Sequence, residues 1–423
     1  MIFLYRFLTF LLFPIFIIIL YFRSLSGKED KLRFLEKISV RKNSSLDQKK
    51  VFWIHAASIG ETNSVLPLIR EIIKKDNKIS VLLTTTTYSS SQLINKTKFN
   101  RNNFQHRFLT LDIKFLVKKF LDHWQPEIAM FVDSEVWPNY LIELSNRKTP
   151  LILLNGRITM KTLNRWKKLP NLSRKLFNLY DLCLPSSKES EKNLKQLGAK
   201  NVKYLGNLKF CSDNKFKDDR DDLKKIFKES FIWCAASTHP GEEEIIFDTH
   251  MNLKKGGVKV ITIIIPRHIS RSQEILKRVK SLELNGKIIN YFNEISNENE
   301  ILIINTIGEM TKYFYNCKSI FMGKSFSQKL ISVGGQNPIE PAKCGCKIYH
   351  GPFVSNFKEI YEFLNHKQIA KEVINSDNLT KNLLEDYNDK SSDLDKKIIK
   401  ELDEYGKEIL SLTLKEIFKL KKC

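Results

Sequence analysis

The chain has 423 residues, 42% of them hydrophobic and 28% charged, with 16 glycines and 12 prolines, which excludes a collagen-like, low-complexity or wholly disordered protein. Because a single hydrophobic core usually stops growing near about 250–300 residues, we expect two domains. The net charge of +23 favours an anionic partner such as nucleic acid, anionic lipid or a phosphorylated substrate, although a lysine- and asparagine-rich background is the alternative source of this charge.

The first predicted element is an apolar segment over residues 1–22, in which Arg6 is the only charge. Its length suits the hydrocarbon core of a bilayer, so we expect a membrane-anchor helix. A cleavable signal peptide is the alternative, but no small-residue cleavage pattern precedes Arg23. Pro14 leaves open whether the segment spans the bilayer or inserts into one leaflet.

A basic juxtamembrane connector is predicted over residues 23–50. Positive residues beside a membrane segment stay on the cytoplasmic side, so we expect the rest of the chain there, held against anionic lipids. The basic residues of this connector are Arg23, Lys28, Lys31, Arg33, Lys37, Arg41 and Lys42.

Buried strands then alternate with amphipathic helices, a pattern that predicts α/β domains with doubly wound parallel sheets. We expect a first domain over 51–210, a linker over 211–225 and a second domain over 226–423 with a helical C-terminal tail. Such sheets bind ligands at the carboxyl ends of their strands, so we expect a site in a cleft between the two domains. The expected strands are 51–57, 79–86, 128–133, 150–155, 182–185, 231–236, 258–265, 288–291, 301–305 and 319–322.

The turn after the first strand carries Ser58, Gly60 and Glu61. A glycine there lets a substrate approach the backbone, and a carboxylate there is suited to accept a proton from a sugar hydroxyl. The helix dipole is expected to keep Glu61 ionised, at some loss of basicity. The alternative is structural, because the Ser-x-x-Glu spacing is also that of a capping box.

Three further polar turns follow strands in the first half. In the first, the carboxylates Asp133 and Glu135 precede Trp137 and Pro138. Glu135 is suited to stabilise an oxocarbenium-like transition state. The structural alternative is that Pro138 begins a helix and Glu135 lies near its cap. Arg157 and Lys209 each close an apolar stretch, and either is suited to meet an anionic group or to remain a solvated cation.

Four polar turns in the second half also follow apolar stretches, and together they favour a nucleotide site. Backbone amides at helix starts suit a phosphate, and an arginine supplies the planar fork that phosphate prefers. Taken singly, each turn is ordinary loop chemistry. The residues are Ser237, Thr238, His239, then Pro266, Arg267, His268, then Gly308, Glu309, Met310, and finally Gly335, Asn337, Pro338, Ile339 and Glu340.

Neither a metal site nor a cofactor is expected. The seven cysteines contain no C-x-x-C pair and are typical of buried thiols in a reducing compartment. Gly323-Lys324-Ser325 is not a P-loop, because that motif needs a glycine where Lys318 stands.

The ordered set HAASIGET, SEVWPN, NGRIT, GNLKF, ASTHPGEEE, PRH, GEM and GGQNPIEP after an N-terminal anchor resembles the 3-deoxy-D-manno-octulosonic acid (Kdo) transferases, from about residue 51 to 352. The resemblance implies a GT-B fold with two Rossmann-like domains. It also implies transfer of Kdo from CMP-Kdo to the lipid A precursor (lipid IVA) at the inner membrane, in lipopolysaccharide biosynthesis, without a metal.

By this resemblance, Glu61 matches the general base, and Glu135 and Lys209 match positions that stabilise the transition state. The segments 266–268, 308–310 and 337–340 match CMP contacts. The family usually has glycine where Lys324 stands and histidine where Gln336 stands. We expect a single inverting displacement in which Glu61 takes the proton of the acceptor hydroxyl.

Two alternative functions remain open. One is a different GT-B glycosyltransferase that uses another nucleotide-sugar on a membrane glycolipid. The other is a membrane-tethered protein that binds anionic lipid or nucleic acid, although no basic run is interleaved with aromatic residues as single-strand binding requires, so no nucleic-acid partner is expected.

Overall fold

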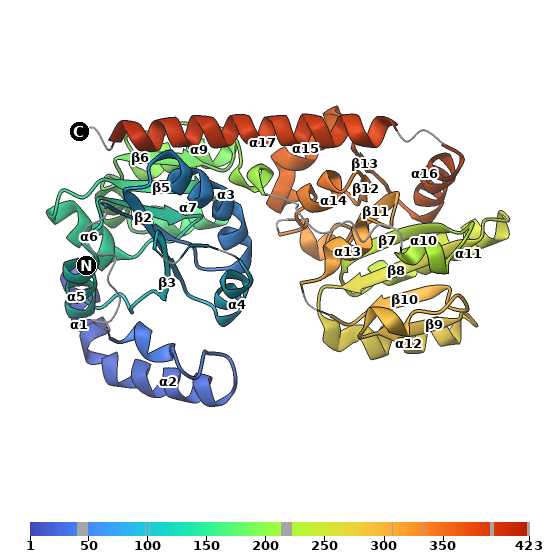
Figure 1. Cartoon of the computed structure of the whole chain (residues 1–423), viewed down its shortest axis with the longest axis horizontal. Coiled ribbons are helices and arrows are strands. Elements are labelled where there is room, and N and C mark those ends of the chain that lie inside the picture. The colour runs from blue at the N-terminus through green and yellow to red at the C-terminus, as the bar shows by residue number, and fades with distance from the viewer. Residues whose placement is uncertain are drawn as a thin grey trace. The chain divides into compact units, whose positions relative to one another are not determined.

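The computed structural model describes residues 1–39, 50–97, 99–100, 102–212, 222–306, 308–331, 333–389 and 393–420. The chain divides into two compact units, Met1–Asp213 with Tyr405–Cys423, and Asn214–Glu404 (Figure 1). Most of the linker predicted over 211–225, and most of the connector's final part, lies outside the described residues.

The first unit contains a six-stranded parallel sheet in the order β3-β2-β1-β4-β5-β6. Helices alternate with the strands, as the sequence predicted. The strands are β1 (Lys50–His55), β2 (Ile79–Thr85), β3 (Phe104–Phe108), β4 (Ile128–Val132), β5 (Leu151–Gly156) and β6 (Leu182–Pro185). The helices are α3 (Ile59–Lys75), α4 (Tyr88–Lys96), α5 (Lys114–Trp124), α6 (Pro138–Asn146), α7 (Met160–Lys167), α8 (Pro170–Phe177), α9 (Lys188–Leu197) and the 3₁₀ turn η2 (Leu208–Cys211).

The fully buried Trp53 of β1 lies at the centre of the first unit's core. Its ring centroid is 5.0 Å from that of Phe120, 5.1 Å from Phe131 and 5.3 Å from Tyr140. Aromatic pairs at such distances add to the stabilisation that burial alone provides. The strand order reverses between β1 and β4, and such switch points are where open α/β sheets bind ligands.

The second unit contains a seven-stranded parallel sheet in the order β13-β12-β11-β7-β8-β10-β9, which reverses between β11 and β7. The strands are β7 (Phe231–Thr238), β8 (Val260–Pro266), β9 (Gly286–Ile289), β10 (Ile301–Ile304), β11 (Ser319–Met322), β12 (Lys347–His350) and β13 (Ala370–Glu372). The helices are α10 (Asp222–Ile226), α11 (Glu242–Lys255), α12 (Ser272–Ser281), α13 (Met310–Phe314), α14 (Ile339–Lys343), α15 (Lys358–His366) and α16 (Ser376–Asn388).

The C-terminal part of α17 (Asp393–Leu420) groups with the first unit, whereas the sequence assigned all of 226–423 to the second domain. The ring of Tyr405 packs 5.2 Å from that of Phe210, and the Cys211 thiol donates to the Gly406 carbonyl oxygen at 3.2 Å. The two backbones are so close that a Cβ on Gly406 would lie 2.3 Å from the Phe210 carbonyl oxygen. This close packing, which the helix's charged pattern does not reveal, explains the difference.

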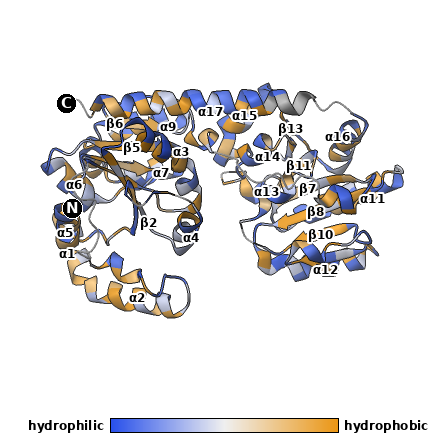
Figure 2. Ribbon diagram, in the orientation of Figure 1, coloured by the Kyte–Doolittle hydropathy of each residue, from blue (hydrophilic) through white to orange (hydrophobic). Residues whose placement is uncertain are grey.

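The apolar segment at the N-terminus forms two helices, α1 (Ile2–Leu11) and α2 (Phe13–Leu25), where the sequence predicted one. Pro14 stands in the first turn of α2, lacks an N–H and cannot continue the preceding helix. Among the described residues, no single helix is long and apolar enough to cross a membrane. The two helices together, bent by 55° at the break between them, have the length and composition of a membrane-crossing segment. Both helices are predominantly hydrophobic in Figure 2.

Polar side chains attach α1 to the first unit. The Tyr5 hydroxyl donates to Asp112 Oδ2 at 2.7 Å, and Arg6 Nε donates to Asn139 Oδ1 at 2.9 Å. Buried Asp112 also accepts the backbone N–H groups of Asn139 and Tyr140, both at 3.1 Å, and so caps the start of α6. One carboxylate therefore holds α1 and α6 together.

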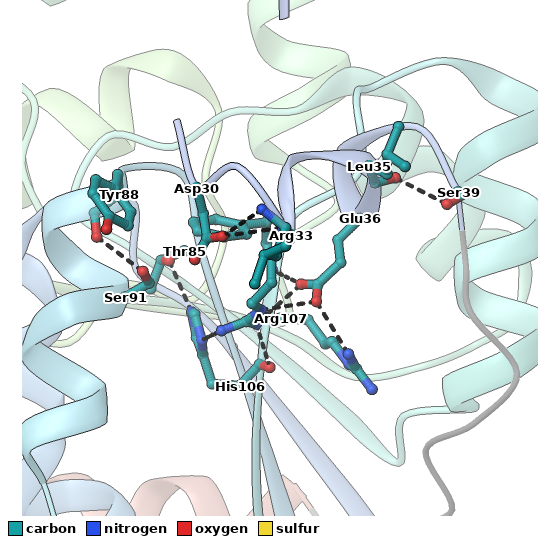
Figure 3. A network of polar contacts seen from close by, with 12 residues as sticks. Asp30, Arg33, Leu35, Glu36, Ser39, Thr85, Tyr88, Ser91, His106 and Arg107 are labelled. Atoms are coloured by element: carbon teal, nitrogen blue, oxygen red, sulfur yellow. Dashed lines mark hydrogen bonds and ion pairs between the residues drawn. The ribbon is translucent and has the colours of Figure 1, made fainter. Parts of the chain in front are cut away.

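A second polar network fixes the segment that follows α2 (Figure 3). Arg33 donates to both carboxylate oxygens of Glu36, at 2.9 and 3.0 Å, and to Nδ1 of His106 at 3.2 Å. Glu36 also accepts from Arg107, and His106 Nε2 lies 2.9 Å from the Thr85 hydroxyl. The connector up to residue 39 is thus joined to strand β3, and His106 of that strand contacts Thr85 of β2.

Candidate active site

Glu61 lies in the first turn of α3, where both of its carboxylate oxygens are bound locally. Oε2 accepts the Ala57 N–H at 2.7 Å, and Oε1 accepts the Ser58 hydroxyl at 2.7 Å. The Ser58 hydroxyl also receives the Glu61 N–H at 3.4 Å. Ser58 therefore caps α3, but the Glu61 carboxylate binds the Ala57 N–H and not the Ser58 N–H that a capping box requires, and it stands at the carboxyl end of β1.

The electrostatic environment of Glu61 differs from the expectation that the helix dipole would reduce its basicity. Burial raises the pKa of the Glu61 carboxyl, and the negative charges of Asp133 and Glu135 raise it further, against hydrogen bonds from Ser58 and Ala57 that lower it. The expected loss of basicity was wrong because desolvation and the like charges outweigh the hydrogen bonds from Ser58 and Ala57. A carboxylate with a raised pKa is a stronger base.

Asp133 and Glu135 follow β4, the neighbour of β1 at the switch point. Asp133 adopts a left-handed backbone with φ of 65°, a strained conformation for a non-glycine residue. Glu135 keeps 23% of its side chain exposed, and its Oε2 lies 3.7 Å from Nε2 of the fully buried His55. Three carboxylates thus gather at the carboxyl ends of β1 and β4.

Two cations balance part of this negative charge. Burial raises the pKa of Asp133, while the positive charges of Lys209 and Arg157 act to lower it. The Lys209 turn is held by two asparagines, because Asn207 Oδ1 accepts the Lys209 N–H and Asn155 Oδ1 accepts the Leu208 N–H, both at 3.0 Å. The sequence predicted Glu61, Glu135, Arg157 and Lys209, and the structure brings them into one electrostatic cluster.

In the second unit, the ends of β7 and β8 bring a group of cations together. The Arg267 N–H donates to the Thr238 carbonyl oxygen at 3.1 Å, and the rings of His239 and His268 lie 6.1 Å apart. Burial lowers the pKa of His239, and the charges of Lys324, His268, Arg267 and Arg271 lower it further. This concentration of positive charge at the sheet's carboxyl edge suits a phosphate-bearing ligand.

Glu242 is a residue whose importance the sequence did not reveal. Its buried carboxylate accepts four backbone N–H groups, from His239 at 2.9 Å, Lys324 at 2.7 Å, Ser325 at 2.7 Å and Phe326 at 3.1 Å. The amides of the turn after β7 were expected to be open to a phosphate, but the His239 amide is occupied by this carboxylate. The feature of the sequence that could have indicated this role is the run of three acidic residues at the start of α11.

The remaining predicted turns lie on the same sheet's carboxyl side. Ser237, with φ of 58°, places its hydroxyl 3.9 Å from the Met310 sulfur. Gly308 is exposed with φ of 84°, and no described atom lies within 4 Å of where its Cβ would be. The Gly335 N–H donates to the Lys324 carbonyl oxygen at 2.6 Å, which joins the loop before α14 to the turn after β11.

The last predicted segment, 337–340, begins α14. Asn337 Oδ1 accepts the Ile339 N–H at 3.3 Å, Pro338 and Ile339 are buried, and Glu340 is partly exposed. Pro266 is buried at the end of β8, whereas Arg267 and His268 are exposed, as is Gly60 in the first unit. Within the described residues, no cluster of three or more histidine, cysteine, aspartate or glutamate side chains has the arrangement to hold a metal ion.

Known proteins resemble this chain in sequence and in fold. The family model of 3-deoxy-D-manno-octulosonic-acid transferase (kdotransferase) matches residues 30–212. The 3-deoxy-D-manno-octulosonic acid transferase of Rickettsia bellii is 31% identical over 385 residues, covering 90% of each chain, and that of Haemophilus influenzae is 28% identical over 83% of this chain and 82% of the relative.

Among solved structures, UDP-GlcNAc 2-epimerase from Neisseria meningitidis, bound to UDP-GlcNAc, matches with a TM-score of 0.59 at 12% identity, covering 88% of this chain and all (100%) of that one. At this identity the likeness concerns the fold, which confirms the predicted GT-B-type pair of parallel sheets. The identity to the Rickettsia bellii protein over nine-tenths of both chains establishes the family. The chain belongs to the 3-deoxy-D-manno-octulosonic acid transferases, which are glycosyltransferases.

Proposed function

We propose that this protein transfers Kdo from CMP-Kdo to the lipid A precursor by a single inverting displacement, with Glu61 as general base. The observation that carries the proposal is the partly buried Glu61 carboxylate beside Asp133 and Glu135, whose charges raise its pKa at the switch point of the first sheet. Family membership supports the reaction class, and the charges around Glu61 support its role as the base.

In the proposed step, the Glu61 carboxylate takes the proton of an acceptor hydroxyl, whose oxygen bonds to the anomeric carbon of Kdo while the bond to CMP breaks. The departing CMP carries the electron pair and negative charge. Glu135 stabilises the oxocarbenium-like transition state, and the positive charge of Lys209 meets the sugar carboxylate. General base catalysis contributes on the order of 10²–10⁴-fold.

The cationic edge of the second unit supports the assignment of CMP to that sheet. Arg267, His268 and Lys324 surround His239 with positive charge, which favours the phosphate of CMP. Gly308 and Met310, with the segment 337–340, are assigned by resemblance to the nucleotide.

We also propose that the N-terminal helices hold the protein at the cytoplasmic face of the inner membrane, where its acceptor resides. Large apolar side chains on α1 and α2 are exposed, including Phe3 at 84% and Phe22 at 63%. Exposed Arg23, Lys28 and Lys31 follow them and favour anionic headgroups. This combination is typical of a membrane-binding element.

The test is Kdo transfer from CMP-Kdo to tetraacylated lipid A precursor, followed by mass spectrometry. Glu61→Gln retains an oxygen for the Ala57 N–H and an amide N–H for the Ser58 hydroxyl, so the helix start is preserved. We expect it to reduce transfer at least 100-fold while CMP binding is unchanged. Near-normal turnover would contradict the role of Glu61.

Two controls separate catalysis from helix capping. Ser58→Ala removes the cap but leaves the carboxylate, so a purely structural Glu61 would make the two variants behave alike. Glu294→Gln alters a second capping-type glutamate, which accepts the Asn290 N–H at 2.9 Å, and should leave transfer unchanged. A larger thermal shift with UDP than with CMP would favour a transferase that uses a different nucleotide-sugar.

A further inference from the structure

His55 is the last residue of β1, is fully buried, and faces Glu135. Its Nδ1 lies 3.0 Å from the Thr84 hydroxyl oxygen and 3.1 Å from the Thr84 carbonyl oxygen. Its Nε2 lies 3.7 Å from Glu135 Oε2 and has no hydrogen-bond partner among the described residues. A buried ring nitrogen without a partner is costly unless it serves a group that arrives later.

Two contacts of the Thr84 side chain favour a proton on Nε2 of His55, against the Thr84 carbonyl oxygen, which lies 3.1 Å from Nδ1 but already accepts the Ala56 N–H at 3.0 Å. The indole N–H of Trp53 can only donate, and it donates to the Thr84 hydroxyl oxygen at 2.9 Å. The hydroxyl must then give its own proton to another acceptor. The His55 Nδ1, at 3.0 Å, is nearer than the Ile54 carbonyl oxygen, at 3.5 Å.

An Nδ1 that accepts this proton leaves the proton of a neutral imidazole on Nε2, which points toward Glu135. The other tautomer would place an Nε2 lone pair opposite a carboxylate oxygen, and no described residue donates a hydrogen bond to that nitrogen. The ring is enclosed by Phe131 at 5.7 Å and Trp137 at 6.3 Å between ring centroids, so its orientation is fixed by packing.

We propose that Trp53 and Thr84 hold His55 as the Nε2–H tautomer, and that this N–H positions the Glu135 carboxylate for the transfer reaction. His55 is thus a positioning residue that acts through Glu135, and the proposal rests on the proposed function. A neutral donor orients the carboxylate while leaving its negative charge available to the transition state. Catalytic hydrogen bonds are often long without substrate, and the 3.7 Å separation closes with a small side-chain movement.

The direct test is the tautomer of His55, read from its imidazole ¹⁵N chemical shifts in ¹⁵N-histidine-labelled full-length protein and assigned by comparison with His55→Gln. We expect a protonated Nε2 and an unprotonated Nδ1. A proton on Nδ1 would overturn the proposal that Trp53 and Thr84 hold His55 as the Nε2–H tautomer. This measurement needs no turnover, so it stands even if the proposed transfer reaction fails.

The functional test compares Thr84→Ser, which retains the hydroxyl, with Thr84→Val, which removes it at nearly the same volume. We expect Thr84→Val to lower kcat about 10-fold with little change in acceptor KM, and Thr84→Ser to stay near the wild-type value. Equal kcat in the two variants, in a preparation whose wild type transfers Kdo, would overturn the positioning role. A wild type without transfer would instead overturn the proposed function.

The chain supplies a matched control for the effect of losing a buried threonine hydroxyl. His250 Nδ1 lies 2.9 Å from the Thr262 hydroxyl in the second unit, and both residues are fully buried. Thr262→Val should lower the melting temperature as Thr84→Val does, with kcat unchanged.

If Thr84→Val does not fold, His55→Gln and His55→Asn replace it, because glutamine carries an amide nitrogen near the Nε2 position and asparagine does not. Equal kcat in these two variants would also overturn the proposal.

Discussion

The carboxylate of Glu242 lies 2.7 Å from the backbone nitrogen of Ser325, although 83 residues separate them in the chain. With three further backbone donors on the same carboxylate, this contact joins the start of α11 to the turn after β11, at the switch point of the second sheet. The shape of the cationic edge therefore depends on one buried side chain.

Glu242→Gln is expected to destabilise this turn by about 2–4 kcal/mol. The amide has one oxygen, and its NH₂ group would face backbone N–H donors that then have no acceptor. Hydrogen exchange of the amides of residues 324–326 should accelerate, and CMP binding by calorimetry should weaken. Glu244→Gln is the control, because Glu244 lies in the same helical turn but is exposed and pairs with Arg278. Equal exchange rates in the two variants would contradict this account.

Lys324→Gly is expected to raise stability by about 0.5–1 kcal/mol and to weaken CMP binding. Lys324 has φ of 62°, a left-handed conformation that a side chain disfavours and glycine adopts freely. The same change removes a positive charge that acts on His239. Gln368→Gly is the control, since Gln368 has φ of 58° and is exposed in the turn before β13. It should gain similar stability with unchanged CMP affinity, and a loss of CMP affinity there would refute the charge argument.

The sequence predicted the position of those candidate site residues that directly follow an apolar strand. Glu61 and Glu135 follow strongly apolar strands, so their place at the sheet's carboxyl edge was foreseeable. The strands β3, β12 and β13 were missed. Gln105, His106 and Arg107 interrupt β3, Lys371 and Glu372 interrupt β13, and β12 is only four residues long. Neighbouring strands supply the hydrogen bonds that make these polar segments extended, and a single segment carries no sign of that pairing.

Long-range partners were beyond sequence reasoning for the same reason. Ser-x-x-Glu spacing predicts that Ser58 and Glu61 meet, because three residues of helix fix their separation. No spacing predicts that His55 meets Glu135, or that Glu242 reaches Ser325, since those distances depend on strand order and turn geometry. The break at Pro14 was visible as a residue, but the docking of α1 that accompanies it depends on Asp112.

The first unit is expected to lose stability as the pH falls below about 6.5, because of His106. Burial, with the charges of Arg33 and Arg107, lowers the pKa of His106 to about 3 from its ordinary value of 6.5. The unfolded chain therefore binds this proton first, and stability falls by up to about 1.4 kcal/mol per pH unit between the two values. Protonation would also remove the Nδ1 lone pair that accepts Arg33.

Urea unfolding followed by tryptophan fluorescence at pH 7, 6 and 5 measures this dependence. Four of the five tryptophans, Trp53, Trp124, Trp137 and Trp166, lie in the first unit. His106→Gln should be less stable at pH 7 but show a shallower decline with falling pH. His366→Gln, which changes an exposed histidine in the last turn of α15, should keep the wild-type slope. The same slope in His106→Gln as in the wild type would rule out His106 as the source.

Tyr5→Phe is expected to cost about 1.5–3 kcal/mol, because it removes a hydrogen bond to a buried carboxylate. Asp112 also caps α6, so the amides of Asn139 and Tyr140 should exchange faster in this variant. Tyr21→Phe removes a hydroxyl from an exposed tyrosine of α2 and serves as the control. Identical exchange at the start of α6 in both variants would show that Tyr5 does not support the Asp112 cap.

Gly60→Ala separates stability from function at the candidate base. Gly60 is the second residue of α3, and alanine in a helix is more stable than glycine by about 0.5–1 kcal/mol. A Cβ at this position would meet no described atom within 4 Å, so the methyl group fits the free protein. It would, however, stand beside Glu61 on the exposed surface where we propose that the acceptor binds. We therefore expect a higher melting temperature together with a higher KM for the acceptor and unchanged CMP affinity.

Gly256→Ala, at the end of α11 with only ordinary contacts at its Cβ, should leave both KM values unchanged. An unchanged acceptor KM in Gly60→Ala would show that the acceptor binds away from this turn, and Glu61 would then lie too far from the hydroxyl to act as its base.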